Sequence, residues 1–328
     1  MKNRNTLSIA IMFCLSLIAY LFINNEPSII RSELRDFSIS DTSQIAEINI
    51  TSKEPETVNL KRVDEKTWLV NEKFKASKSS IFYLLKTLQR MEVAYPVPIS
   101  LRDNVLGNLA VKGLKVDVFL RDGAEKTIYI GGDNKELTAT YMMIKDASDP
   151  YAVHIPGFRG FLSSRFFTDE YLWRDKTVMN YKAPSISSIK MKFYSSGEKD
   201  NSFQIDFDEE SYVLKPLHKK EKAFSNPIKV KAYRNSFQNL FAETFVMKEK
   251  IERDSLTHIA PIFNLTVKAS TDETQLKVFH KKADDKAQVK EDRIYDPERL
   301  YACVNDKDWM IIQKHSFKNV IKKLNDFK

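Results

Sequence analysis

The stretch Ile45-Ala-Glu-Ile-Asn-Ile50 alternates apolar and polar residues, and the same alternation recurs at Ile186-Ser-Ser-Ile-Lys-Met-Lys-Phe193. A period of two places successive side chains on opposite faces, which is typical of a strand that buries one face. Each stretch is followed by two more short alternating runs, at 57–61 and 67–70 in the first case and at 202–207 and 211–214 in the second. Each set predicts an antiparallel meander.

A helix is expected after each meander. In the first half, the apolar residues from Ile81 to Leu88 recur at helical spacing behind Ser77, Ser79 and Ser80, which are good capping residues. This spacing predicts a helix over 78–91. In the second half, an aromatic stripe with the same spacing predicts a helix over 232–247; its members are Phe237, Leu240, Phe241 and Phe245. We interpret both stripes as sides that face a core rather than as ligand sites.

Alternating strands then return in the same order in both halves. The first half has them at 114–120, 128–130, 140–144 and 151–155, and the second at 263–269, 276–278, 300–304 and 309–312. The matching order predicts an α+β fold in which two similar sheet-plus-helix units arose by internal duplication. The expected units are 45–155 and 186–328, and the expected connector between them is 156–185.

An unbroken apolar run from Leu7 to Ile23 precedes this body. As a helix, these residues would extend about 25 Å, which is close to the thickness of a bilayer's hydrocarbon core. Lys2 and Arg4 lie before the run, and this positive charge keeps the first end in the cytoplasm. The sequence predicts one transmembrane helix at 7–23, with a cytoplasmic tip at 1–6 and a spacer at 24–44. The body would then lie outside the cytoplasm, which in a bacterium means the periplasm, and the protein would be a single-pass protein of the inner membrane.

Two alternatives to an uncleaved anchor remain open. A cleaved signal peptide would carry small residues before the cut, but the run ends Tyr20-Leu-Phe-Ile-Asn-Asn-Glu26. A lipidated cysteine would be Cys14, but Ile11-Met-Phe13 precedes it where small residues are expected. The uncleaved anchor fits the sequence better than either.

The composition excludes several classes of protein. The net charge of +8 is the difference between 52 basic and 44 acidic residues, and the charges are mixed along the chain rather than gathered in an arginine-rich patch. This pattern argues against nucleic-acid binding and fits solvated loops. With two cysteines, one of them inside the apolar run, a disulfide framework is excluded.

The chain carries no recognisable motif for chemistry. Its five histidines show no zinc-site spacing, and neither a nucleophile elbow nor a phosphate-binding loop occurs. Gly131-Gly132 is interpreted as part of a turn rather than as a phosphate cradle. The sequence therefore predicts a non-catalytic protein without cofactor, metal or small-molecule ligand, which works by contact. The alternative is an envelope hydrolase acting on glycan or peptide, with carboxylates brought together only by folding.

The expected contact surfaces are the connector and any sheet edge left open. Within the connector, an aromatic and charged set is the candidate for partner contact: Phe158, Phe161, Trp173, Arg174 and Asp175. For Arg174 and Asp175, a local salt bridge is the competing interpretation.

Several passages in order resemble a bacterial family known as domain of unknown function 4340. They are Leu34-Arg-Asp-Phe37, Asp41-Thr-Ser-Gln-Ile-Ala46, Thr67-Trp-Leu-Val-Asn71, Asn104-Val-Leu-Gly-Asn-Leu-Ala110, Ile128-Tyr-Ile-Gly-Gly132, Thr140-Tyr-Met-Met143, Ile155-Pro-Gly-Phe158 and Trp173-Arg-Asp-Lys176. The resemblance implies a membrane-anchored protein and offers no catalytic residues. Genes of this family often accompany those of ABC-type export or gliding-like transporters. The resemblance therefore implies an ABC-type permease or its extracytoplasmic subunits as partners.

Overall fold

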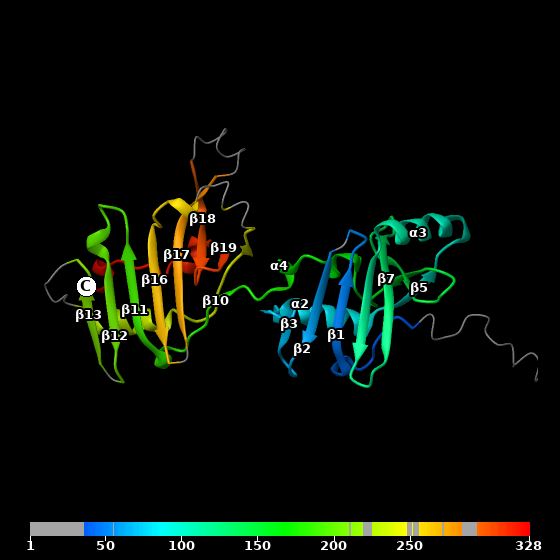
Figure 1. The fold of residues 1–328 in the computed structure, drawn as a ribbon, viewed down its shortest axis with the longest axis horizontal. Coiled ribbons are helices and arrows are strands. Elements are labelled where there is room, and N and C mark those ends of the chain that lie inside the picture. The colour runs from blue at the N-terminus through cyan, green and yellow to red at the C-terminus, as the bar shows by residue number, and fades with distance from the viewer. Residues whose placement is uncertain are drawn as a thin grey trace, which may run out of the picture. The chain divides into compact units, whose positions relative to one another are not determined.

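A computed structural model describes residues 36–54, 56–209, 211–218, 225–247, 251, 256–270, 272–283 and 294–328. These residues form two compact units, which divide between Arg174 and Asp175 (Figure 1). The segment predicted to span the membrane, 7–23, lies outside the described residues. Within the described ranges, none of the helices combines the length and the apolar character that a membrane crossing requires.

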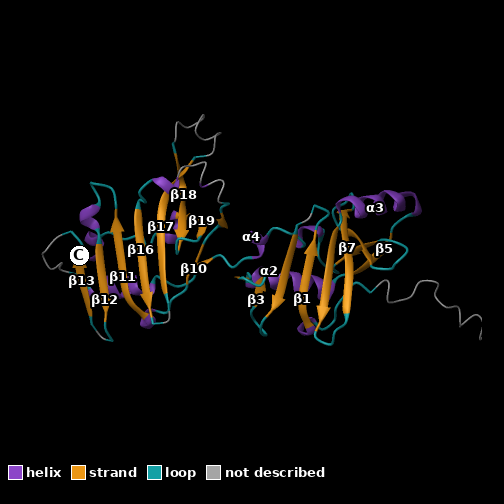
Figure 2. Ribbon diagram, in the orientation of Figure 1, coloured by secondary structure: helices purple, strands orange, loops and turns teal. Residues whose placement is uncertain are grey.

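The first unit is built on a nine-stranded antiparallel sheet with the order β4-β3-β2-β1-β6-β7-β8-β9-β5 (Figure 2). Consecutive strands are mostly neighbours, as the meanders predict. The strands are β1 (Ile45–Thr51), β2 (Thr57–Arg62), β3 (Trp68–Val70), β4 (Phe74–Lys75), β5 (Glu92–Pro96), β6 (Leu114–Leu120), β7 (Glu125–Asp133), β8 (Thr140–Ile144) and β9 (Tyr151–His154).

The second unit holds an eight-stranded sheet with the order β13-β12-β11-β16-β17-β18-β19-β15, and a two-stranded sheet of β10 and β14. Apart from the extra edge strand β4, the two large sheets have the same strand order when β1 is matched with β11 and β6 with β16. The strands are β10 (Thr177–Met179), β11 (Ile186–Phe193), β12 (Phe203–Phe207), β13 (Tyr212–Pro216), β14 (Leu240–Phe241), β15 (Thr244–Phe245), β16 (Phe263–Ala269), β17 (Glu273–Lys282), β18 (Tyr295–Val304) and β19 (Asp308–Gln313).

The predicted α+β class is wrong, because the described chain is mostly β and is dominated by the two large antiparallel sheets. The helices are few and short: α2 (Lys78–Arg90), α3 (Ile99–Lys112), α4 (Glu170–Trp173), α5 (Pro227–Asn235) and α8 (Lys314–Phe317). The 3₁₀ turns are Thr42–Gln44, Ser163–Arg165, Ala183–Ser185, Lys199–Asn201, Leu256–His258 and Leu324–Phe327. The alternating segments of the sequence therefore determine the class far more than the helical stripes do.

Helix α2 lies where the first stripe predicts it. The Ser77 hydroxyl accepts a hydrogen bond from the Ser80 amide and so satisfies one of the free donors at the start of the helix. Ile81, Leu84 and Leu88 are buried against the sheet. Because these residues recur every three or four positions, they form one side of the helix and close the core of the first unit.

The second predicted helix is wrong in its position. Helix α5 covers Pro227–Asn235, begins at the cap Asn226, and ends before the aromatic stripe, part of which forms β14 and β15. Asn239 has a φ of 53°, which no α-helix contains. Phe237 is nevertheless buried and meets the Tyr233 ring edge-to-face at 5.1 Å. Leu240 and Phe245 are buried as well, but Phe241 is 51% exposed, so the stripe is neither a helix nor wholly part of a core.

The unit boundaries differ from the expected ones. Phe37 and Ile39, from the expected spacer, are buried in the first core. Leu162, Phe166 and Trp173, from the expected connector, are buried in the same core. The first unit consequently extends beyond the sheet at both ends.

Candidate functional site

Helix α3 covers part of one face of the first sheet, on the side opposite α2. Along β7, Ile128 and Ile130 point into the core that α2 closes, whereas Tyr129 packs in a separate small cluster with Val105 and Leu109 of α3. This division follows from strand geometry, because successive side chains point to opposite faces. The sheet of the first unit thus has a second layer, and neither α3 nor β5 was predicted from the sequence.

Two features hold α3 in place. The Arg102 guanidinium donates to Asp149 Oδ1 over 2.6 Å and to the Ser148 carbonyl over 3.0 Å. The Ser148 hydroxyl and then Arg102 lower the pKa of Asp149. At the other end of α3, Gly131 of β7 permits close approach, because a Cβ there would lie 2.9 Å from Leu109 Cδ2. A large side chain at this position is incompatible with the packing of α3.

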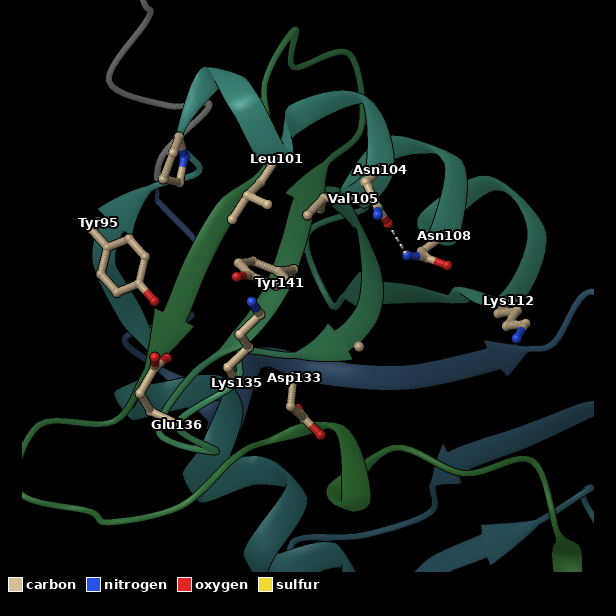
Figure 3. A pocket seen from close by; sticks show the side chains of 12 residues that line it. Tyr95, Leu101, Asn104, Val105, Asn108, Lys112, Asp133, Lys135, Glu136 and Tyr141 are labelled. Carbon is tan, nitrogen blue, oxygen red and sulfur yellow. Dashed lines mark hydrogen bonds between the residues drawn. The ribbon is translucent and has the colours of Figure 1, made fainter.

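A cavity of about 590 Å³ lies between α3 and the strands beneath it (Figure 3). This volume is in the usual range for small-molecule sites. The lining joins an apolar part near α3 to a polar rim formed by β5, β8 and the turn after β7. The residues are Tyr95, Pro98, Leu101, Asn104, Val105, Asn108, Lys112, Gly132, Asp133, Lys135, Glu136 and Tyr141.

A bulge in β5 places Tyr95 in this cavity. Val93 pairs with Val153 on the core face, and Tyr95 pairs with Ala152, so that β5 has one extra residue, Ala94, between the two pairs. Without the bulge, Tyr95 would follow Val93 onto the core face, because residues two apart in a strand share a face. The bulge turns the phenol towards α3, and its oxygen accepts a hydrogen bond from Asn134 Nδ2 at 3.0 Å.

A second bulge, in β7, turns a carboxylate away from the cavity. Ile130 pairs with Met142 and Asp133 pairs with Thr140, which leaves an extra residue in Gly131-Gly132. Asp133 therefore points to the core face, where its carboxylate accepts from Thr140 Oγ1 at 2.6 Å and Ser163 Oγ at 2.8 Å. Figure 3 shows this side chain directed away from the cavity. The glycine pair therefore forms a bulge within β7 rather than a hairpin turn.

The turn after β7 presents Lys135 and Glu136 to the cavity. The buried Asn134 side chain fixes this turn, because its oxygen accepts from the amides of Thr138 and Ala139. Figure 3 shows the side chains of Tyr95, Lys135, Glu136 and Tyr141 converging. Burial, followed by Tyr95 and Glu136, raises the pKa of Tyr141. The Tyr141 phenol thus stays neutral and able to donate a hydrogen bond at physiological pH.

The outward side of α3 mixes exposed apolar residues with Ser100 and Asp103, and the Asp103 side chain is 98% exposed. Ile99 is 91% exposed and Val111 is 68% exposed, and the small residues Gly107 and Ala110 lie on the same side. A Cβ at Gly107 would meet no atom within 4 Å. We refer to Ile99, Gly107, Ala110 and Val111 as the α3 outer face.

The five residues predicted for partner contact occupy different environments. Phe158 is 39% exposed and lies under the Arg165 guanidinium, and Phe161 is half-buried. Trp173 and Arg174 are buried in the first unit; the indole stacks on Phe167, and the guanidinium lies 3.8 Å from Glu170 Oε1. Asp175 accepts from the Thr177 hydroxyl at 2.7 Å. Trp173 and Arg174 are thus packing residues of the first unit, and Phe158 is the most exposed of the set.

A second cavity, of about 610 Å³, lies in the second unit beside Arg234. Arg234 stacks on Phe207 and donates to the carbonyls of Pro184 and Ile186, which end the 3₁₀ turn before β11. In the first unit, Arg62 likewise donates to the carbonyls of Thr42 and Ile45 before β1. Both arginines hold the backbone at the start of the central strand of their sheet. The arginine beside the second cavity therefore has a structural role.

Groups suited to hydrolysis or metal binding do not converge at the first cavity. The hydrolase hypothesis predicts two convergent carboxylates, but Glu136 faces the cavity while Asp133 is turned away. His154 lies 3.7 Å from Glu92, on the exposed edge formed by β5 and β9. Among the residues that the structure describes, no group of three or more His, Cys, Asp or Glu side chains could hold a metal ion. The cavity offers hydrogen-bonding and apolar groups, which suit binding.

Comparison with known proteins gave one match. The chain matches the model of a family described as Domain of unknown function (DUF4340) over residues 68–258. Searches of curated proteins and of solved structures found no match. The matched segment includes α3, the cavity and the beginning of the second unit, and it is more than half of the 328 residues. The resemblance seen in the sequence is confirmed, and the chain belongs to the DUF4340 family.

Proposed function

We propose that this protein is a membrane-anchored extracytoplasmic protein that works by contact, as an accessory subunit of an ABC-type envelope transport complex or a gliding-like complex. The proposed contact surface is the α3 outer face. It exposes Ile99 and Val111 on a helix that is itself held firmly by Arg102 and Gly131. Exposed apolar side chains on a fixed helix can form part of a protein–protein contact.

Membrane anchoring rests on the apolar run from Leu7 to Ile23 and on Lys2 and Arg4 before it. Confinement to the membrane raises the effective concentration of a co-anchored partner, so that a small contact surface such as the α3 outer face suffices. An ABC-type permease or its extracytoplasmic subunit is the proposed partner, because family resemblance associates such genes with transporters.

Reporter fusions test the location of the body. A reporter that is active only outside the cytoplasm, fused after Lys328, should be active, and a reporter that is active only in the cytoplasm should be silent. The expected result follows from the positive charge on the first side of the apolar run. Activity of the cytoplasmic reporter alone would place the body on the wrong side for the proposed function.

Affinity purification tests the partner. The tagged full chain, extracted in a gentle detergent from cells that express the transporter, should recover a permease or ATPase subunit in stoichiometric amount. Gly107→Arg should abolish this recovery, because a long charged side chain would stand in the middle of the α3 outer face. The protein should still fold, since a Cβ at Gly107 has open space around it.

Gly107→Ala is the matched control. It keeps the face small and apolar, so that recovery of the partner should be unchanged, and it should raise the free energy of unfolding by about 0.5–1 kcal/mol because alanine favours the helix over glycine. Recovery of the protein alone, or equal recovery with Gly107→Arg, would contradict the proposed contact.

A further inference from the structure

We propose that the cavity between α3 and the sheet of the first unit binds a neutral saccharide. In this arrangement the C–H face of a sugar ring lies on the apolar side chains of α3, and its hydroxyls meet Tyr95, Tyr141, Lys135 and Glu136. The site is on the inner side of α3, and the proposed partner contact is on the outer face. Saccharide binding is therefore independent of whether the partner is an ABC-type complex.

The charge of the lining favours a neutral ligand. Of the four charged residues in the lining, Lys112 and Lys135 are positive and Glu136 is negative, while the Asp133 carboxylate points to the core face, so the cavity is close to neutral. The Asp133 carboxylate is already occupied by Thr140 and Ser163. An anion such as a phosphate would be expected to attract an excess of arginine or lysine, and a metal ion would require several convergent carboxylates. Neither arrangement is present in this lining.

The polar groups of the rim include both donors and acceptors. The Tyr95 oxygen accepts from Asn134, which leaves the phenol hydrogen to donate, and Tyr141 is neutral for the reason given above. Glu136 accepts and Lys135 donates. On α3, Asn108 donates to Asn104 Oδ1 over 2.7 Å, and both residues belong to the lining. Sugar hydroxyls both donate and accept, and therefore match a mixed rim of this kind.

The apolar floor of the cavity and its volume also suit a saccharide. Pro98, Leu101 and Val105 form an apolar patch beside the rim, and Val105 is buried. Gly132 belongs to the lining and adds no side chain to it, and a Cβ at this position would meet no atom within 4 Å. A sugar ring is polar at its edge and apolar on its face, and about 590 Å³ is room for a ligand of this class.

The test is saturation-transfer difference NMR on the full chain in a detergent without a sugar headgroup. The probes are cellobiose and N,N′-diacetylchitobiose, which carry plain hydroxyls and acetamido groups respectively. At least one should bind saturably with a dissociation constant of about 0.1–5 mM, a range equivalent to a few hydrogen bonds and one stacked ring face. Gly132→Leu should weaken this binding at least about tenfold by filling the cavity.

Two further variants keep the test decisive. Tyr141→Phe removes one hydroxyl and keeps the ring, so it should weaken binding about fivefold even if Gly132→Leu folds poorly. Val63→Ser, in an exposed turn of the same unit, should bind as the wild type does. The inference is overturned if neither saccharide saturates, if Tyr141→Phe and a folded Gly132→Leu both bind unchanged, or if adenosine, a flat aromatic control, binds more tightly than both sugars.

Discussion

Replacing Leu88 by Asp should unfold the first unit. Leu88 is fully buried between α2 and the sheet, in the same core as Ile48 and Val116. The substitution removes a large apolar side chain and leaves a carboxylate without a partner in an apolar environment. We expect a loss of about 4 kcal/mol or more, which is a large part of the stability of a typical domain. Urea unfolding followed by circular dichroism measures this loss.

Phe82→Asp is the control on the same helix. Phe82 is 56% exposed, so the same introduced charge remains solvated and the expected change is within about 1 kcal/mol. If both variants lost the same free energy of unfolding, the side of α2 that contains Leu88 would not be the side that closes the core.

Replacing Gly131 by Ala should release α3 from the sheet. The new Cβ would lie 2.9 Å from the Tyr141 carbonyl oxygen as well as 2.9 Å from Leu109 Cδ2. The backbone oxygen cannot rotate away as a side chain can, so that β7 or α3 must move. Overpacking of this kind typically costs about 1–3 kcal/mol. Hydrogen exchange should show faster exchange of the α3 amides from 103 to 112, and the urea midpoint should fall.

The neighbouring residue provides the control. Gly132→Ala places its Cβ in open space, so the α3 amides should keep the protection of the wild type. If the two alanine variants exchanged alike, close approach at Gly131 would not be what positions α3.

The strands were predictable because their signal is local. Ile48 and Ile50 are buried two residues apart, as the alternation in β1 predicts, whereas Ile45 is buried three residues before Ile48, where the pairing with β6 shifts register. The helix α2 was predictable for the same reason. The aromatic stripe after Phe237 was misleading because buried aromatic residues also occur at irregular positions, and Asn239 interrupts any helix there. Core membership was thus easier to predict than the backbone conformation.

The site was not predictable, because it depends on bulges and on an unusual helix. Helix α3 buries only a narrow side, Val105 and Leu109, so its sequence shows no broad amphipathic stripe. A bulge is one extra residue in one of two paired strands, so it cannot be seen in the sequence of a single strand. The bulge in β5 is evident only from the pairing of Val93 and Tyr95 with β9. The signal that was available is the pair Gly131-Gly132, because two glycines in an alternating segment also indicate a bulge or a close approach.

We propose that the α3 outer face contacts a partner at the membrane. The most direct test places a photo-crosslinking amino acid at Val111 in the full chain and irradiates living cells. A matched position is Val63, which is 60% exposed where Val111 is 68% exposed. We expect one adduct from position 111, containing a subunit of an ABC-type membrane complex, and no such adduct from position 63. The absence of that adduct at position 111, or the same adduct from both positions, would contradict the proposal.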